Sequence, residues 1–171
     1  MKQFILFILL ISGTGLSSLG QTLLAAWTFD TLSASPNTPK TYPASLGSQI
    51  TVACLYSDGT NGASNWNSSE LNSFAGTIIN DPRGGSAFAG KAYSLVNITA
   101  NGKSIVLKFS MTGYQDAVLT YATQKTSTGF SSQQWAFSID SLNFLNAGSP
   151  ISPPVSFATQ TLDLSGLVQI N

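Results

Sequence analysis

Hydrophobic and polar residues alternate along most of this chain, and this period of two is the feature that most constrains its fold. A β-strand places successive side chains on opposite faces, so alternation predicts a sheet with one face in the core and one in water. The segment 103–111 shows the pattern best. Its residues Ile105, Leu107 and Phe109 share one face, and no stretch keeps a helical period over three turns. The chain is therefore expected to be all-β and antiparallel.

Turn residues separate the alternating segments at intervals typical of a two-sheet antiparallel sandwich. Thr112 and Gly113 lie between two strong segments and predict a hairpin turn, and the Pro-rich stretch 146–154 predicts a stiff connection. Strands are expected at 25–29, 50–56, 103–111, 116–125 and 134–140, with weaker ones at 76–79, 92–98 and 155–162.

The apolar faces of these strands predict which residues form the core. Cys54 shares an alternating face with Ile50, Val52 and Tyr56, so it is expected to be a small buried hydrophobic residue. Because it is the only cysteine, no internal disulfide can form. The other expected core residues are Trp27, Phe29, Ile105, Leu107, Phe109, Leu119, Tyr121, Trp135, Phe137 and Ile139.

Residues 1–20 have the pattern of an export signal. An apolar run at 4–11 is followed by small residues, among them Ser18 and Gly20, which predict cleavage before Gln21. The alternative is a membrane anchor. The run is well short of the roughly 20 apolar residues that span a bilayer, so a cleaved signal peptide and no stable membrane insertion are expected.

The remainder, 21–171, has the length of one domain, and secretion would place it outside the cell or on its surface. The stretch 162–171 stops where another strand could begin. Folded proteins normally cover an open sheet edge. We therefore expect the domain to be incomplete at its C-terminal end and the sequence to be a fragment. The alternative is a natural short chain that ends in a loop.

Composition excludes several functions. The chain has no histidine, which removes Ser-His-Asp and Cys-His catalysis and imidazole zinc sites. Seven Lys and Arg residues balance seven Asp and Glu residues, so no basic patch for nucleic acid is expected. No nucleotide-binding motif occurs, and no two acids stand in a recognisable glycosidase motif. The sequence predicts neither an enzyme nor a bound organic cofactor.

Two aromatic residues in polar surroundings are candidates for sugar binding. Trp66 lies in the loop SNWNSS between Asn65 and Asn67, and Tyr114 lies beside the predicted hairpin turn. Aromatic faces next to amide and hydroxyl groups suit a neutral glycan. The alternative for Trp66 is a loop anchor tucked into the end of the sandwich.

A structural calcium ion is a further possibility at Asp58-Gly-Thr-Asn61. Asp58 and Asn61 would supply the hard oxygen ligands that calcium prefers. The segment lacks the alternating acids and the distal glutamate of an EF-hand. An ordinary Asx-rich turn is the alternative interpretation.

Four short features give the chain a family resemblance. They are AWTFD at the first expected strand, the Thr-Gly-Tyr hairpin, the Ser-Thr-Gly loop and the aromatic strand that ends in Asp140. With the stretch KFSMTGYQDAVLTYATQKTSTGFSSQQWAFSID, they resemble jelly-roll modules of secreted multidomain proteins of Gram-negative bacteria, the concanavalin-like or carbohydrate-binding-like sandwiches. Such modules often continue with Asp-Gly, whereas Asp140 precedes Ser141 here.

The resemblance implies a non-catalytic extracellular binding or accessory module, and it transfers no catalytic residue. Two alternatives stay open. One is the N-terminal accessory region of a secreted hydrolase or nuclease whose catalytic domain lies beyond Asn171. The other is a structural surface or adhesion protein.

Overall fold

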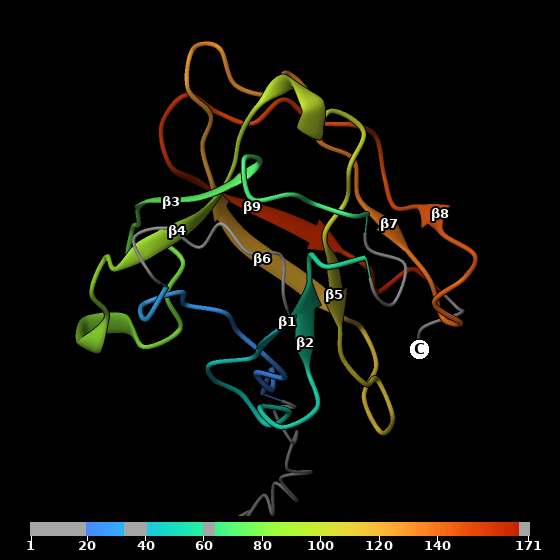
Figure 1. The fold of residues 1–171 in the computed structure, drawn as a ribbon. Coiled ribbons are helices and arrows are strands. Elements are labelled where there is room, and N and C mark those ends of the chain that lie inside the picture. Colours follow the sequence, from blue (N-terminus) through green and yellow to red (C-terminus); the bar gives the residue numbers. More distant parts are fainter. Residues whose placement is uncertain (1–19, 33–40, 60–63, 168–171) are drawn as a thin grey trace, which may run out of the picture.

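A computed structural model describes residues 20–32, 41–59 and 64–167 (Figure 1). This part of the chain is all-β, as predicted, with two single 3₁₀ turns, η1 (Gly84–Ser86) and η2 (Ile98–Ala100). The strands are β1 (Thr41–Pro43), β2 (Cys54–Tyr56), β3 (Leu71–Ala75), β4 (Lys91–Leu95), β5 (Val106–Lys108), β6 (Val118–Thr123), β7 (Ala136–Phe137), β8 (Leu145–Asn146) and β9 (Ala158–Asp163).

The predicted export segment lies outside the described residues apart from Gly20. In the part that is described, no helix has the length and apolar character to cross a membrane.

The strands form four antiparallel ladders. One sheet has the order β1-β2-β5, and the other ladders pair β3 with β4, β6 with β9, and β7 with β8. The β6–β9 ladder joins Val118 to Asp163 at one end and Thr123 to Ala158 at the other. In Figure 1 it crosses the middle of the molecule, with β3–β4 on its left and β7–β8 on its right.

The predicted hairpin between 103–111 and 116–125 is wrong. The turn itself forms, because the Tyr114 amide donates to the Met111 carbonyl at 2.9 Å and Gly113 has a φ of +81°. The strands on either side of the turn do not pair with each other. Strand β5 pairs with β2, and strand β6 pairs with β9. Alternation predicts where a strand lies in the sequence but not which strand it pairs with, because the pairing depends on long-range packing.

Two other strand predictions are also corrected. Segment 25–29 makes a single bridge, between Ala26 and Leu46, and Phe29 leaves the extended conformation at a φ of +56°. Segment 76–79 bends and turns after β3 instead of forming a strand. Its apolar pair Ile78 and Ile79 lies exposed.

The buried face of β2 has the opposite phase from the predicted one. Residues 49–52 form a turn, in which the Ala53 amide donates to the Gln49 carbonyl at 2.8 Å, and Ile50 and Val52 are exposed. The chain therefore enters β2 with Ala53, Leu55 and Ser57 buried. Cys54, on the other face, is half-buried, so its predicted burial is wrong.

A compact apolar cluster centres on Trp66, Leu71 and Ala100, all buried. Half-buried side chains pack around it, among them Tyr93 and Phe130, which brings strands β3 and β4 together with the loop after β6. The ten residues predicted for the core beside Cys54 are half-buried except one. Ile139 is 70% exposed, because β7 ends at Phe137 and the chain then turns.

Candidate functional site

Trp66 is buried, so its predicted role as a sugar platform is wrong. Only 5% of the residue is exposed, and its indole Nε1–H donates to the Ser104 carbonyl at 2.8 Å. The Lys103 ammonium lies 5.9 Å from the ring centroid. Its polar neighbours face water while the ring packs inward, and the loop-anchor interpretation of Trp66 is the correct one.

The residues after Trp66 form a tight turn around a buried acid. The Asn67 amide donates to Glu70 Oε2 at 3.0 Å, and Asn67 Oδ1 accepts from the Ser69 amide at 3.0 Å. Lys103 Nζ lies 2.5 Å from Glu70 Oε2. Its ammonium, followed by the Asn67 amide, lowers the pKa of Glu70 to about 2. Asn67 thus stabilises its own loop, as polar residues at a turn start commonly do.

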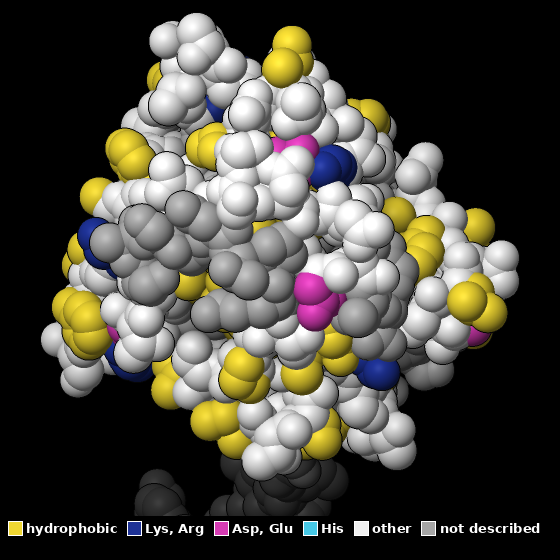
Figure 2. Space-filling model, viewed as in Figure 1, with side chains coloured by type: hydrophobic (Ala, Val, Ile, Leu, Met, Phe, Trp, Pro, Cys, Tyr) yellow, Lys and Arg dark blue, Asp and Glu magenta, His cyan; other side chains and the backbone are white. Residues whose placement is uncertain are grey.

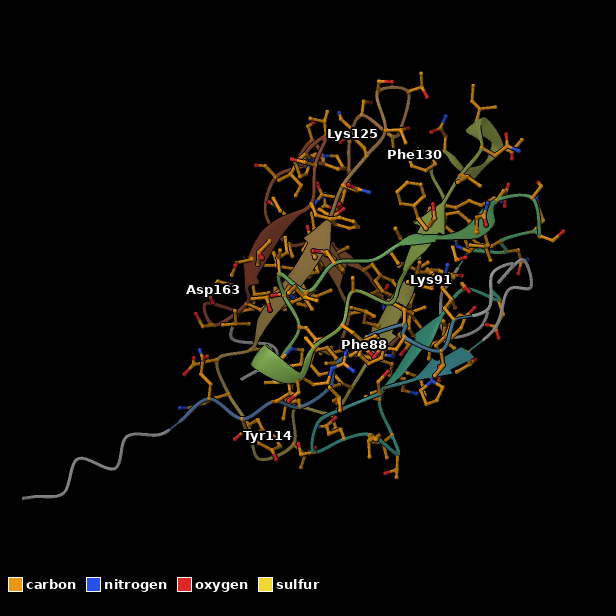
Figure 3. The ribbon with its side chains drawn as sticks, turned by 90° about the vertical axis from the view of Figure 1, so that its left-hand side faces the viewer. Phe88, Lys91, Tyr114, Lys125, Phe130 and Asp163 are labelled. Carbon is orange, nitrogen blue, oxygen red and sulfur yellow. The ribbon has the colours of Figure 1, made fainter. Side chains whose placement is uncertain are left out.

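Tyr114 is exposed, as predicted, but it lies far from Trp66. Figure 3 shows Tyr114 and Phe130 at opposite ends of the molecule, and Phe130 packs against the Trp66 cluster. The two aromatic residues predicted to bind sugar therefore do not share a site.

Asp58 and Asn65 form an isolated antiparallel bridge, and the Thr41 hydroxyl donates to Asp58 Oδ2 at 3.3 Å. Asn61, the other predicted calcium ligand, lies outside the described residues. No three Asp, Glu or Cys side chains come together within 20–32, 41–59 and 64–167. The calcium site stays a prediction.

A different place in the molecule combines aromatic and polar side chains around a cavity. This cavity has a volume of about 520 Å³ and lies between the N-terminal segment 27–32 and the stretch 42–46. Trp27, Phe29 and Tyr42 line it, and each is half-buried. Asp30 and Arg83 form its charged wall. We call this space the N-terminal cavity.

Contacts behind its walls hold the aromatic residues of the N-terminal cavity in place. Trp27 Nε1–H donates to the Tyr42 carbonyl at 3.0 Å. Phe29 stacks on Tyr93 with centroids 5.6 Å apart, and the Tyr93 hydroxyl donates to Ser57 Oγ at 2.8 Å. Burial raises the pKa of Tyr93 to about 12, so its phenol stays neutral. The positive φ of Phe29 is unusual for an aromatic residue, and this packing maintains it.

Arg83 organises the charged wall. Its Nη1 lies 2.5 Å from Asp30 Oδ2, its Nε and Nη2 donate to the two oxygens of Asp81, and its guanidinium lies 4.9 Å from the Phe88 ring centroid. Hydrogen bonds from Arg83 lower the pKa of Asp81, and both carboxylates raise that of Arg83. The guanidinium binds Asp30 and Asp81 at once, so it occupies the place that a metal cation between these two carboxylates would take.

Gly90 lies against this wall with a φ of +49°. A Cβ there would come within 2.6 Å of Asp30 Oδ1, so any larger residue would displace the Asp30 carboxylate.

No family model, curated protein or solved structure matches this chain. The N-terminal cavity is therefore interpreted from its own residues. Alternation predicted Trp27 and Phe29 to be core residues, and no local pattern marked Asp30 or Arg83 as part of a site. One sequence feature was available: Arg83 is the only arginine in a chain with few charges, and arginine suits a buried, bidentate ion pair better than lysine does.

A second, smaller hollow of about 230 Å³ is lined by the turn between β7 and β8. Asp140 anchors that turn by accepting the Leu142 and Asn143 amides, both at 2.8 Å, and these bonds hold its pKa well below the usual range. Its carboxylate is occupied by the turn, so this hollow offers mainly apolar surface from Phe137, Ile139 and Leu145.

Proposed function

We propose that this protein is a non-catalytic glycan-binding module and that the glycan binds in the N-terminal cavity. The observation that carries the proposal is the combination of Trp27, Phe29 and Tyr42 with two charged side chains around about 520 Å³. Small-ligand sites typically join apolar area to a few fixed polar groups in a space of this size. Half-buried aromatic rings offer the flat apolar surface against which a sugar ring packs.

Four of the seven acid groups have pKa values that favour binding over hydrolysis. A glycosidase needs one carboxylic acid with a raised pKa, which gives its proton to the leaving oxygen. Hydrogen bonds and cationic neighbours lower the pKa values of Glu70, Asp81, Asp140 and Asp163 instead. These acids are ionised at neutral pH and are poor proton donors.

The surface charge favours a glycan over nucleic acid. Binding to nucleic acid depends on several Lys and Arg contacts to phosphates. The chain has seven such residues, one of them in the predicted export signal. In Figure 2, the described Lys and Arg side chains that are in view lie apart from one another. We infer that the ligand is not a polyphosphate and that a glycan without acidic groups is compatible with this surface.

The wider context is part of the proposal. We place the protein outside the cell or on its surface after cleavage before Gln21, and we assign its ladders to a jelly-roll-type sandwich. Both alternative functions, an accessory region of a secreted hydrolase or nuclease and a surface or adhesion protein, are compatible with glycan binding in this cavity.

A glycan array followed by titration calorimetry tests the proposal. Trp27→Ala should weaken binding of the best array ligand about tenfold or more, the effect of about 1.4 kcal/mol. Tyr114→Ala is the matched control, because it removes an exposed aromatic residue away from the cavity and should leave binding unchanged. Ser45→Trp fills the cavity from an exposed position and should also abolish binding.

Thermal melts of the three variants show whether each is folded. Ser45→Trp keeps the test decisive if Trp27→Ala does not fold. The proposal is wrong if no glycan binds to the protein, or if Tyr114→Ala weakens binding while Ser45→Trp does not.

A further inference from the structure

We infer that the N-terminal cavity selects a glycan with free amino groups, whose protonated amine binds Asp30 between the aromatic side chains. This inference rests on the proposed function and names the class of sugar that the same cavity takes.

Asp30 has an oxygen available for a ligand. Its Oδ2 accepts from Arg83, whereas Oδ1 accepts no hydrogen bond from the residues that the structure describes. Oδ1 lies beside Gly90, and the Asp30 side chain lines the cavity and is 13% exposed. Oδ1 is therefore the atom that we expect a donor in the cavity to approach. An acceptor in that position is best satisfied by an N–H or O–H group of the ligand.

The charge of the wall distinguishes an amine from a hydroxyl or an acid. Arg83 contributes one positive charge, and Asp30 and Asp81 contribute two negative charges, which leaves the cluster at −1. All three guanidinium nitrogens of Arg83 already donate to carboxylates. An acidic sugar would therefore meet net repulsion, whereas an ammonium group would gain a charge-assisted hydrogen bond.

The aromatic walls add to this preference. A cation within about 6 Å of an aromatic ring face is attracted by the ring quadrupole, and the attraction grows as water is excluded. Trp27, Phe29 and Tyr42 all line the space into which the Asp30 wall faces. An amine held by Asp30 would thus be enclosed by rings as well as bound by a carboxylate.

Paired oligosaccharides test the inference directly. A glucosamine hexamer and its fully N-acetylated counterpart share one backbone and differ in the charge of each amine. Below the pKa of the free amine, the glucosamine hexamer should bind the wild-type protein about ten times more tightly in calorimetry. Raising the pH until that amine is neutral should remove the difference. Arg83 and Tyr42, which also face the cavity, have raised pKa values and keep their charge states over this interval.

Two isosteric variants assign the contact. Asp30→Asn and Asp81→Asn each remove one carboxylate from Arg83, but only Asp30 lines the cavity. Asp30→Asn should abolish the preference for the amine, and Asp81→Asn should keep most of it. An equal loss in both variants would overturn the assignment to Asp30.

The wild-type pH series needs no variant, so it decides the matter even if Asp30→Asn does not fold. Equal affinity for the two hexamers at every pH would overturn the inference and leave the proposed function standing. If the protein binds no glycan at all, the proposed function itself is wrong.

Discussion

The region that contains β1 to β5 and the region that contains β6 to β9 are stabilised in different ways. Within the described ranges, the first buries most of the apolar side chains and holds the acids of two ion pairs, Glu70 with Lys103 and Asp81 with Arg83. The buried apolar residues of the first region are Ala44, Ala53, Leu55, Trp66, Leu71 and Ala100, and those of the second are Ala147, Pro153 and Leu164.

The second region depends on backbone pairing and on shared hydrogen bonds. Its β6–β9 ladder is the longest of the described strand pairs. Tyr121 on β6 accepts from Trp135 Nε1 at 2.9 Å and from Gln133 Nε2 at 2.7 Å, and its ring meets the Trp135 ring edge-on. Side-chain burial thus contributes most to the first region and hydrogen bonding most to the second, so substitutions of each kind should affect the two regions differently.

Removal of a buried ring from the first region should have the largest effect. Trp66→Ala should lower the free energy of unfolding by about 3–5 kcal/mol, as buried aromatic-to-alanine changes do. Trp135→Ala, at a half-buried position in the second region, should have a smaller effect. Urea unfolding measures both. An equal or larger loss for Trp135→Ala would show that burial does not distinguish the regions.

Trp66→Phe separates the ring from its hydrogen bond to Ser104. It keeps most of the buried area and should recover much of the stability that alanine loses. Full loss in the phenylalanine variant would mean that the indole N–H stabilises the loop more than packing does.

Removal of one hydroxyl from the second region should come next. Tyr121→Phe keeps the ring but leaves the Trp135 and Gln133 donors without their acceptor, which should cost about 1–3 kcal/mol. Tyr93→Phe is the counterpart in the first region. The Tyr93 hydroxyl bonds two other hydroxyls, those of Ser57 and Tyr42, which can rotate to other partners, whereas the Trp135 N–H is fixed. Equal losses for the two variants would remove the special role of the Tyr121 hydroxyl.

Acid should weaken the first region through Glu70. The pKa of Glu70 is about 2 in the folded protein and ordinarily 4.5. The contribution of Glu70 is therefore fully present above pH 4.5 and is lost as the pH falls toward 2. Glu70→Gln should reduce the pH dependence of the urea midpoint in this interval. Asp163→Asn is the control in the second region, since hydrogen bonds from Ser165 also lower the pKa of Asp163.

If the two variants reduce the pH dependence of the urea midpoint equally, the buried Glu70–Lys103 pair contributes no more to it than the exposed Asp163 does. Glu70→Gln can also lower stability at neutral pH, where it removes a charge partner of Lys103. The slope of the profile, rather than its height, therefore carries the test.

The all-β class was predictable because alternation is a local property, and the structure confirms it. Strand partners were not predictable, because β5 and β6 each pair with a strand far away in sequence. The phase of β2 was missed for a similar reason. Its alternation is continuous in the sequence, but the turn at 49–52 ends the face to which Ile50 and Val52 were assigned.

The site was less predictable than the fold. Polar neighbours suggested that Trp66 was exposed, yet a side chain can pack inward from a polar loop when its N–H finds a buried acceptor. Trp27 and Phe29 were predicted to lie in the core, and both are half-buried. Their place beside Asp30 and Arg83 depends on a contact between residues 53 positions apart, which no local pattern encodes.

The connection between the two regions should tolerate change best, and Gly113 there gives the smallest expected effect. Gly113 has a φ of +81°, which strains any residue with a Cβ, although the space around it is open. Gly113→Ala should therefore cost about 1 kcal/mol through backbone strain alone. Gly166→Ala is the matched control, because Gly166 has open space and no positive φ, and it should be neutral or slightly stabilising. Because β5 and β6 do not pair, strain in this turn has no ladder between them to disrupt. A loss of several kcal/mol in Gly113→Ala would show that the turn aligns the two regions, and it would replace the view of them as separately stabilised with one of a single cooperative unit.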